Sequence, residues 1–496
     1  MPTYRTPDVY VEEISVFPPS VAEVETALPA FIGYTQKATR TTTNDLILKP
    51  TKIYSLKEYE DLFGFAREET LTLTLVADAV AGFRVSAFQV NGVTPTDAFL
   101  LDYLLYYAVK MYFDNGGGQC YIVSVGLYQT TPDISLKGAE PDVAAAGEED
   151  TNFGLRDGLD VLALEDEPTL IVIPEAATLG AADYGTLVQA VLAQCGTLRD
   201  RFGIFDAYRG NRAQDLDSNV VLTGTTMMSN AAAARNAFGT QNLKYGAVYY
   251  PYLRTTLNYF APEANVSVTY PHGAGTTTAT LAALKTGNTA VYNFARASLA
   301  DRYLIMPPSG AVAGVYAWTD TNRGVWKAPA NVSLAGVLGP VIRLDTAHQD
   351  TLNVDVTSGK SINAIRSFAG KGTLVWGART LAGNDNEWRY ISVRRLFSVV
   401  EESVKNATKW AVFEPNDANT WTRVRGMIEN YLTQKWREGA LAGATPKDAF
   451  FVRCGLGTTM SAVDILEGRM NVEIGMAVVR PTEFIILRVT QKQQTP

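Results

Sequence analysis

Three stretches of the sequence hold residues of the kinds that bind phosphate or attack a carbonyl group. The run Gly359-Lys-Ser resembles the end of a phosphate-binding loop, but that motif also needs glycine where Val354 stands. The run Cys454-Gly-Leu-Gly-Thr-Thr resembles a dinucleotide-binding turn, but the fingerprint needs a third glycine where Met460 stands. Ser309 lacks the Gly-x-Ser-x-Gly frame of a nucleophile elbow. None of the three motifs is complete.

The sequence also contains few residues that could carry out acid–base catalysis or bind a metal. The chain has two histidines, His272 and His348, and neither lies in a recognisable motif. Glu401 and Glu402 are adjacent on a predicted helix, so they point about 100° apart and do not form a carboxylate dyad. Three scattered cysteines are too few for a zinc cluster or a disulfide framework, and we expect small buried hydrophobes at Cys120, Cys195 and Cys454.

These absences predict a protein that is not an enzyme, with no catalytic residue, no cofactor and no metal. The sequence leaves open only that carboxylates distant along the chain meet in space.

With 496 residues, 47% of them hydrophobic, the chain is expected to form two or more domains. Its net charge of −8 argues against a general nucleic-acid-binding surface. The amino terminus has no signal-like apolar region and no apolar run is long enough to span a bilayer, so membrane insertion is not expected.

Strands and helices alternate through the middle of the chain. Residues 170–173 and 202–205 read as short apolar strands, and helical spacing runs between them over 182–195. This order predicts an α/β domain with a partly parallel sheet, within an overall mixed α+β chain. Residues 262–289, rich in Thr, Ala and Gly, predict an exposed hairpin or loop. The acidic stretch 133–167 is interpreted as a solvated surface loop in preference to a binding site.

The last third alternates helices and strands more densely. We expect a helix from near Glu387 and another from near Thr420 that ends at Gly439. The first of these should bury apolar residues at helical spacing: Val393, Leu396, Val400 and Val404. After them we expect a helix start at Thr445-Pro446, a strand over 450–453, a short helix capped by Ser461, and strands over 471–475 and 483–489.

Two interpretations are weighed for charged and for aromatic residues in the later part of the chain. Arg394 with Arg395, and Arg423 with Arg425, are interpreted as solvated faces or subunit salt bridges in preference to phosphate contacts. Core packing is preferred over a subunit interface for the seven tryptophans, which all fall in the later part of the chain. They are Trp318, Trp326, Trp376, Trp388, Trp410, Trp421 and Trp436.

The amino-terminal segment alternates like a strand with one buried face. Val9 and Val11 lie on one face, and Asp8, Tyr10 and Glu12 lie on the other. Prolines at both ends of the segment indicate a detached edge strand followed by a stiff linker. An unpaired amphipathic edge at each terminus is an aggregation hazard unless a partner pairs it.

The sequence resembles the contractile tail sheath family in blocks that keep the family's order. The opening Tyr4-Arg-Thr-Pro-Asp-Val-Tyr-Val-Glu-Glu-Ile and the later Pro307-Pro-Ser-Gly-Ala-Val-Ala-Gly-Val-Tyr are similar to family motifs. So are Arg323-Gly-Val-Trp-Lys-Ala-Pro-Ala-Asn, Val375-Trp-Gly-Ala-Arg-Thr-Leu, Arg389-Tyr-Ile-Ser-Val-Arg-Arg-Leu-Phe and the closing Arg480-Pro-Thr-Glu-Phe-Ile-Ile-Leu. Stretches near 66–98, 133–167 and 262–289 have no evident counterpart and are interpreted as insertions.

The resemblance implies a structural subunit of the sheath around the inner tube of a phage tail or phage-tail-like injection system. It implies a strand arm over 1–20, an outward α/β domain over 21–345 that carries the insertions, and a tube-facing domain over 346–496 ending in an arm near 472–490. Stacked hexameric rings would be linked by exchange of the arms, taken as 7–15 and 482–490. The arm residues are Pro7, Asp8, Val9, Tyr10, Val11, Glu12 and Glu13, with Phe484, Ile485, Ile486, Leu487, Arg488 and Val489.

The resemblance also implies partners and a place of assembly. The partners are neighbouring sheath subunits, the inner tube, baseplate and tail-terminator or cap proteins, and paralogous sheath subunits where a particle has them. Asp464, Glu467 and Arg469 are candidates for tube contact, with an ordinary surface helix as the alternative. Assembly is expected in the bacterial cytoplasm, with the product in a virion tail or a released extracellular particle. The alternatives are a receptor-binding or adhesin-like particle protein and an α/β enzyme.

Overall fold

The computed structural model describes residues 21–484, apart from 81, 137–152, 213–234 and 274, and also residue 486. The chain forms two compact units. The larger contains Glu25–Ser398 and Arg480–Pro496, and the smaller contains Met1–Val24 and Val399–Val479. Residues 346–398 thus belong to the larger unit. The expected division at residue 345, between an outward and a tube-facing domain, describes the assembled particle. It stays a prediction.

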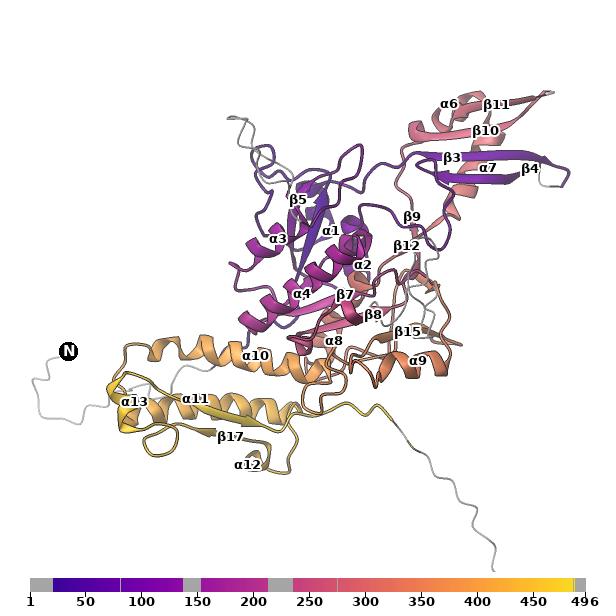
Figure 1. Cartoon of the computed structure of the whole chain (residues 1–496). Coiled ribbons are helices and arrows are strands. Elements are labelled where there is room, and N and C mark those ends of the chain that lie inside the picture. Colours follow the sequence, from indigo (N-terminus) through magenta and orange to yellow (C-terminus); the bar gives the residue numbers. More distant parts are fainter. Residues whose placement is uncertain are drawn as a thin grey trace, which may run out of the picture. The chain divides into compact units, whose positions relative to one another are not determined.

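A nine-stranded sheet is the centre of the larger unit (Figure 1). Its six middle strands are parallel, and antiparallel strands lie at both edges. In spatial order the strands are β13 (Val332–Ser333), β16 (Gly372–Val375), β15 (Asn363–Phe368), β8 (Gly246–Tyr250), β7 (Phe202–Asp206), β6 (Leu170–Val172), β1 (Pro29–Thr35), β5 (Cys120–Leu127) and β2 (Thr51–Ile53). The predicted α/β domain with a partly parallel sheet is therefore confirmed.

Helices cover both faces of this sheet, because its middle strands are apolar on both sides. Phe31 packs into one hydrophobic core with α2 and α8, and its neighbour Ile32 packs into a second core with α3 and α4. The three cysteines are buried, as predicted. The helices of this part are α1 (Leu56–Phe63), α2 (Leu105–Asp114), α3 (Leu155–Leu162), α4 (Ala181–Leu198), α8 (Ser309–Arg323) and α9 (Thr346–Asn353), with short 3-10 turns η1 (Pro174–Thr178) and η2 (Leu243–Tyr245).

Two of the three presumed insertions meet in a separate four-stranded sheet of the larger unit (Figure 1). Stretch 66–98 supplies a hairpin, stretch 262–289 supplies another, and the two join in parallel where Val268 pairs with Leu73. The elements are β3 (Leu71–Asp78), β4 (Gly82–Val90), η3 (Glu263–Asn265), β10 (Val266–His272), β11 (Gly275–Thr280), α6 (Leu281–Gly287) and α7 (Thr289–Ala300). A three-stranded sheet is formed by β9 (Leu253–Asn258), β12 (Tyr303–Met306) and β14 (Val337–Pro340).

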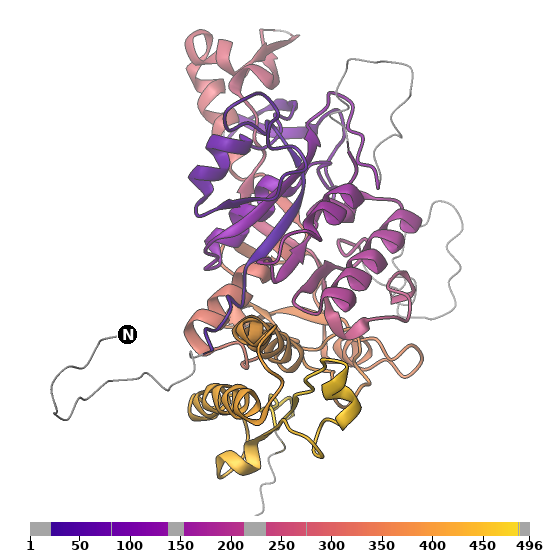
Figure 2. The same ribbon diagram turned by 90° about the vertical axis from the view of Figure 1, so that its left-hand side faces the viewer.

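The smaller unit is built on α11 (Ala418–Arg437) and on the second half of α10 (Ile391–Thr408), a helix that begins in the larger unit (Figures 1 and 2). Asp417 caps α11 by accepting a hydrogen bond from the backbone N–H of Thr420 at 2.9 Å. The helix ends before Gly439, whose φ of 84° is the left-handed conformation that glycine adopts freely. The other elements are η4 (Lys409–Ala411), α12 (Pro446–Ala449), β17 (Phe450–Arg453), α13 (Ala462–Leu466) and β18 (Glu473–Met476).

Four details differ from the sequence predictions. The stretch 133–167, interpreted as a solvated surface loop, contains α3, whose Leu155, Leu159 and Leu162 are buried in the core. Helix α10 begins at Ile391, later than predicted, because the Asp385 carboxylate binds the N–H groups of Glu387 and Trp388 in a turn. Arg394 and Arg395 are buried rather than solvated. None of the seven tryptophans is buried in the core; Trp318 and Trp376 are exposed and the other five are half-buried. The preference for core packing of the tryptophans is therefore wrong for the single chain.

Candidate functional site

The incomplete phosphate-loop motif has a structural role. Lys360 is buried, and its ammonium group donates to the carbonyl oxygen of Arg235 at 2.8 Å. Burial lowers the pKa of Lys360. The hydroxyl of Ser361 donates to the carbonyl oxygen of Asn353 at 2.6 Å. Both side chains therefore hold backbone segments of the larger unit together.

A buried carboxylate at the end of β7 contacts Ser309, the serine of the incomplete elbow motif. Asp206 accepts hydrogen bonds from the backbone N–H of Ser309 at 2.7 Å and from its hydroxyl at 2.6 Å. Burial raises the pKa of Asp206 to about 7, and the two hydrogen bonds only partly oppose this. Since the first N–H groups of a helix have no partner within the helix, Asp206 acts as the cap of α8.

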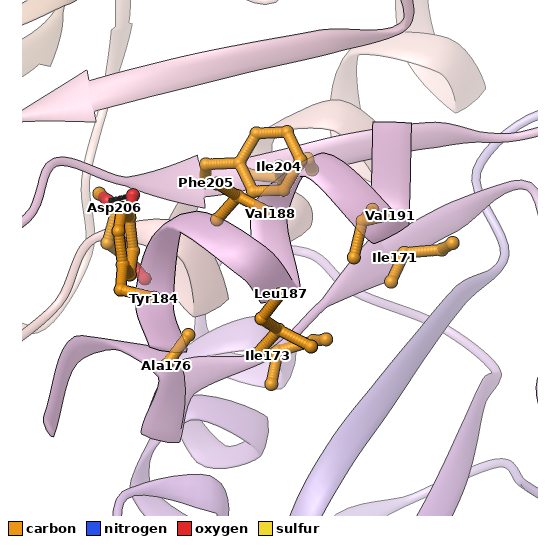
Figure 3. Close-up of a pocket in the computed structure, with 10 residues that line it drawn as sticks. All are labelled: Ile171, Ile173, Ala176, Tyr184, Leu187, Val188, Val191, Ile204, Phe205 and Asp206. Atoms are coloured by element: carbon orange, nitrogen blue, oxygen red, sulfur yellow. Dashed lines mark hydrogen bonds between the residues drawn. The ribbon is translucent and has the colours of Figure 1, made fainter. Parts of the chain in front are cut away.

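The space beside Asp206 cannot admit a substrate. Figure 3 shows a cavity lined almost entirely by apolar side chains of β6, η1, β7 and α4, and by Ile173 between β6 and η1, with Asp206 at one end. Its volume is about 10 Å³, about what one water molecule needs. The hydroxyl of Tyr184 donates to the carbonyl oxygen of Asp206 at 2.6 Å and closes that end.

A second buried carboxylate does the same for α2. Glu175, in η1, accepts hydrogen bonds from the N–H groups of Leu104 at 3.1 Å and Leu105 at 2.8 Å. Burial raises the pKa of Glu175 to about 7. Gly33 provides the space, because a Cβ at that position would collide with the carboxylate. The capped helices α2 and α8 pack against each other, so both carboxylates position one helix pair. Sequence analysis missed them because their partners lie far along the chain.

The part of the chain that the structure describes has neither a metal-binding cluster nor a helix that could span a membrane. No group of three His, Cys, Asp or Glu side chains there is placed to hold a metal ion. In the same residues, no helix combines the length and apolar character needed to cross a membrane.

The three candidate tube-contact residues come together at α13. Ser461 caps this helix, and its backbone and side-chain hydrogen bonds, with a smaller contribution from Arg469, lower the pKa of Asp464 to about 2. The guanidinium group of Arg469 lies 3.0 Å from Asp464 through Nε and also forms an ion pair with Glu467. Beside this network Leu466 is 86% exposed, an apolar feature that the sequence analysis did not single out.

The described part of the amino-terminal segment is fastened to the smaller unit. The predicted arm residues 7–13 lie outside the described residues. Glu23 forms an ion pair with Lys435 of α11 at 2.6 Å, and the N–H of Val24 donates to the Ser403 hydroxyl at 3.1 Å. The side chain of Lys435 is 4% exposed and also binds Glu438 at 2.7 Å. The segment is therefore held at its root.

The carboxy-terminal segment is fastened to the larger unit through Glu483. Its carboxylate accepts two hydrogen bonds from Arg379, at 2.8 and 2.6 Å. Beyond it, Phe484 and Ile486 are 69% and 79% exposed and are not in strands. The other predicted arm residues, Ile485 and 487–489, lie outside the described residues.

A two-stranded ribbon of β17 and β18 completes the candidate surfaces. The strands pair antiparallel from Phe450 opposite Met476 to Arg453 opposite Glu473. Among the described residues no third strand joins this sheet. Such edges can pair with a strand from another chain.

Comparison with known proteins gives consistent matches. The family model described as "Phage tail sheath protein central domain" matches residues 219–381, and "Phage tail sheath C-terminal domain" matches 383–492. The tail sheath protein of Vibrio phage KVP40 is 32% identical over 136 residues, which are 27% of this chain and 20% of that protein. The tail sheath protein of Burkholderia phage BcepMu is 25% identical over 38% of this chain and 36% of its own. The chain thus aligns with well under two thirds of these relatives' lengths.

Solved structures match over almost the whole chain. The helical sheath of the anti-feeding prophage in its contracted state is 30% identical, with a TM-score of 0.60, and the match covers 99% of this chain and 100% of that one. The sheath complex of PVC, an extracellular contractile injection system, also in the contracted state, is 29% identical, with a TM-score of 0.61 and 99% coverage of both chains.

Proposed function

We propose, because the chain belongs to the phage tail sheath family, that it is a structural subunit of the contractile sheath around the inner tube of a phage tail or phage-tail-like injection system. The observation that carries the proposal is the end-to-end match to a contracted helical sheath at 30% identity. The blocks of sequence that resemble the family run through both units, so the resemblance does not depend on one domain.

Subunits are proposed to form stacked hexameric rings joined by exchange of the terminal arms. Residues 7–15 and 482–490 would each add a strand to a β17–β18 ribbon of a neighbouring subunit. The ribbon supports this, because two strands alone are marginally stable in water and gain from further pairing. The exposed apolar side chains of Phe484 and Ile486 also favour a partner for the carboxy-terminal arm.

Contact with the inner tube is proposed at α13. Asp464, Glu467 and Arg469 pair with one another in the single chain, so a tube partner would have to share or exchange these ion pairs. Leu466, and Val463 at 57% exposure, supply an apolar surface at the same helix. The tube contact would therefore combine a small apolar centre with charges at its rim, as protein interfaces commonly do.

Contraction is proposed to be mechanical, with no catalytic step in the chain. Free energy stored when the extended rings assemble would drive rigid-body rotation of the folded units, with the arms keeping neighbours connected. The roles found for Lys360, Asp206 and Glu175 support this reading, because each is used to hold the fold.

The remaining partners are inferred from the same assignment. They are baseplate and tail-terminator or cap proteins, the ends at which a sheath must stop, and paralogous sheath subunits where a particle has them. Assembly would take place in the bacterial cytoplasm, and the product would be found in a virion tail or a released particle. Neither nucleic acid nor membrane insertion has a part in this proposal.

Negative-stain electron microscopy of the purified chain tests the proposal. Regular hollow cylinders are expected from the full-length chain and none from a variant lacking residues 1–18. A variant lacking 138–150, a shorter deletion in the acidic stretch, should still form cylinders. Cylinders from all three variants would keep the sheath and contradict the linking role of the arm. If no variant forms cylinders, alone or with inner tube, while the four-stranded sheet binds a cell surface, the receptor-binding alternative replaces the proposal.

A further inference from the structure

Each terminal segment meets the folded chain through a glutamate on a buried cation. Glu23 binds Lys435 within the smaller unit, and Glu483 binds Arg379 within the larger unit. Both cations have side chains that are 4% exposed. Both terminal segments are therefore held by a glutamate paired with a buried cation, although they are fastened to different units.

We infer that Glu483 and Arg379 form a fixed anchor that sets the point at which the carboxy-terminal arm leaves the subunit. The inference rests on the proposed function, since it assigns the positioning residues of an arm. Glu483 is a positioning residue here, because it acts on the neighbouring subunit only through the residues that follow it.

The geometry at Glu483 supports an anchor rather than a passing contact. Nε and Nη2 of Arg379 bind the two carboxylate oxygens, an arrangement that fixes orientation as well as distance. The side-chain amide of Asn353 donates to the same carboxylate at 3.0 Å, and the hydroxyl of Tyr390 donates at 3.3 Å. Burial opposes ionisation, but these hydrogen bonds and the charge of Arg379 bring the pKa of Glu483 below its ordinary value.

The two described residues beyond Glu483 are exposed. Phe484 is 69% exposed and Ile486 is 79% exposed, and the hydrogen bonds described for the larger unit reach neither of them. Glu483 is thus the last described residue held by the subunit's own side chains. The residues that follow are the ones proposed to pair with a neighbour.

The amino-terminal root is held less firmly. Lys435 offers a single ammonium group, which Glu23 shares with Glu438, and the Glu23 side chain is 34% exposed. A lysine contact lacks the two-point geometry of arginine with a carboxylate. We therefore assign the fixed anchor to the carboxy-terminal root alone.

Chymotrypsin cleavage after Phe484 tests the anchor in the full, unassembled chain. A protease needs several residues around the cleaved bond in extended form, so an anchored Glu483 should slow this cut. Glu483→Ala should speed it about tenfold, the factor expected when a charged hydrogen-bonded pair is lost, and Glu483→Gln should fall between. Asp97→Ala, which removes an exposed carboxylate 2.6 Å from Arg254 in the same unit, is the matched control and should leave the rate unchanged.

Cylinder formation is then compared in the same variants by electron microscopy. Faster cleavage together with lost or shortened cylinders in Glu483→Ala supports the inference, when both are measured well below the melting temperature of the variant, because the loss of the counter-ion of Arg379 also lowers stability. An unchanged cleavage rate overturns it, whatever the cylinders do. Faster cleavage with intact cylinders also overturns it, because the arm would then need no fixed root. If the unaltered chain forms no cylinders even with inner tube, the proposed function fails, and the cleavage rates still decide whether the anchor exists.

Discussion

Gly310 of α8 lies directly against the backbone of Ala108 in α2. A Cβ atom at position 310 would come 2.5 Å from the carbonyl oxygen of Ala108, closer than real Cβ contacts allow. The two helices are thus packed backbone to backbone, with a buried carboxylate at the start of each. Glycine at this position permits the close approach.

Replacing Gly310 with alanine should destabilise the chain by about 1–3 kcal/mol, because the new methyl group would force α2 and α8 apart. Urea unfolding of unassembled subunits measures the change. Gly426→Ala is the control: it lies in α11 with nothing within 4 Å of the new Cβ, so higher helix propensity should stabilise it by up to about 1 kcal/mol. Equal effects of the two substitutions would show that helix propensity, and not packing, determines the change in the free energy of unfolding.

Stability should fall as pH rises toward neutrality. Burial raises the pKa of Asp206 to about 7, so between about pH 4 and 7 the folded chain keeps a proton that the unfolded chain releases. Its contribution is therefore present at acid pH and is lost as pH rises to about 7. Glu175 acts in the same direction. Asp206→Asn, which mimics the protonated form, should show a flatter dependence between pH 5 and 8 in urea unfolding; a curve parallel to that of the unaltered chain would contradict the assignment.

Removing a buried acid from α8 should cost far more than removing an exposed one. Asp320 binds Arg395 at 2.9 Å through Oδ1, and the two side chains are 2% and 4% exposed. Asp320→Ala would leave a buried guanidinium without its counter-ion, at a cost of about 3–5 kcal/mol. The exposed pair Lys57–Asp61 supplies the control, since Asp61→Ala should change the free energy of unfolding by less than about 1 kcal/mol. Chemical denaturation of both variants measures the two changes in the free energy of unfolding.

An acidic residue in place of Leu466 should weaken the proposed tube contact without unfolding the subunit. The side chain is 86% exposed, so Leu466→Asp should leave the melting temperature within a few degrees. Co-sedimentation with preassembled inner tubes should drop severalfold. Leu456→Asp, also in the smaller unit at 54% exposure, serves as the comparison and should sediment as the unaltered chain does. Undiminished sedimentation of Leu466→Asp would remove α13 from the contact.

Periodicity predicted the elements whose burial repeats regularly. The helix from Thr420 to Gly439 appears as α11 because its apolar residues recur at helical spacing and both ends carry capping residues. The strands around Leu170 and Phe202 appear as β6 and β7 because short apolar runs suit a sheet covered on both faces. The short helix after Ser461 was likewise predicted from its capping residue.

Contacts between residues distant along the chain could not be predicted from the sequence. Nothing near Asp206 indicates that it meets Ser309, and nothing near Glu483 indicates Arg379. The burial of Arg395 was missed for the same reason, because its partner Asp320 belongs to another helix. The family resemblance gave the proposed function but could not show that two presumed insertions share one sheet.

The pairing of Glu23 with Lys435 has a consequence for synthesis on the ribosome. The two residues are separated by 412 positions, so the root of the amino-terminal arm has no partner until almost the whole chain has been made. At about 5–20 residues per second, the wait is on the order of tens of seconds. The β17–β18 ribbon is also translated late. A nascent chain therefore carries an unfastened arm but no finished ribbon to receive one, which favours completing each subunit before it joins a lattice.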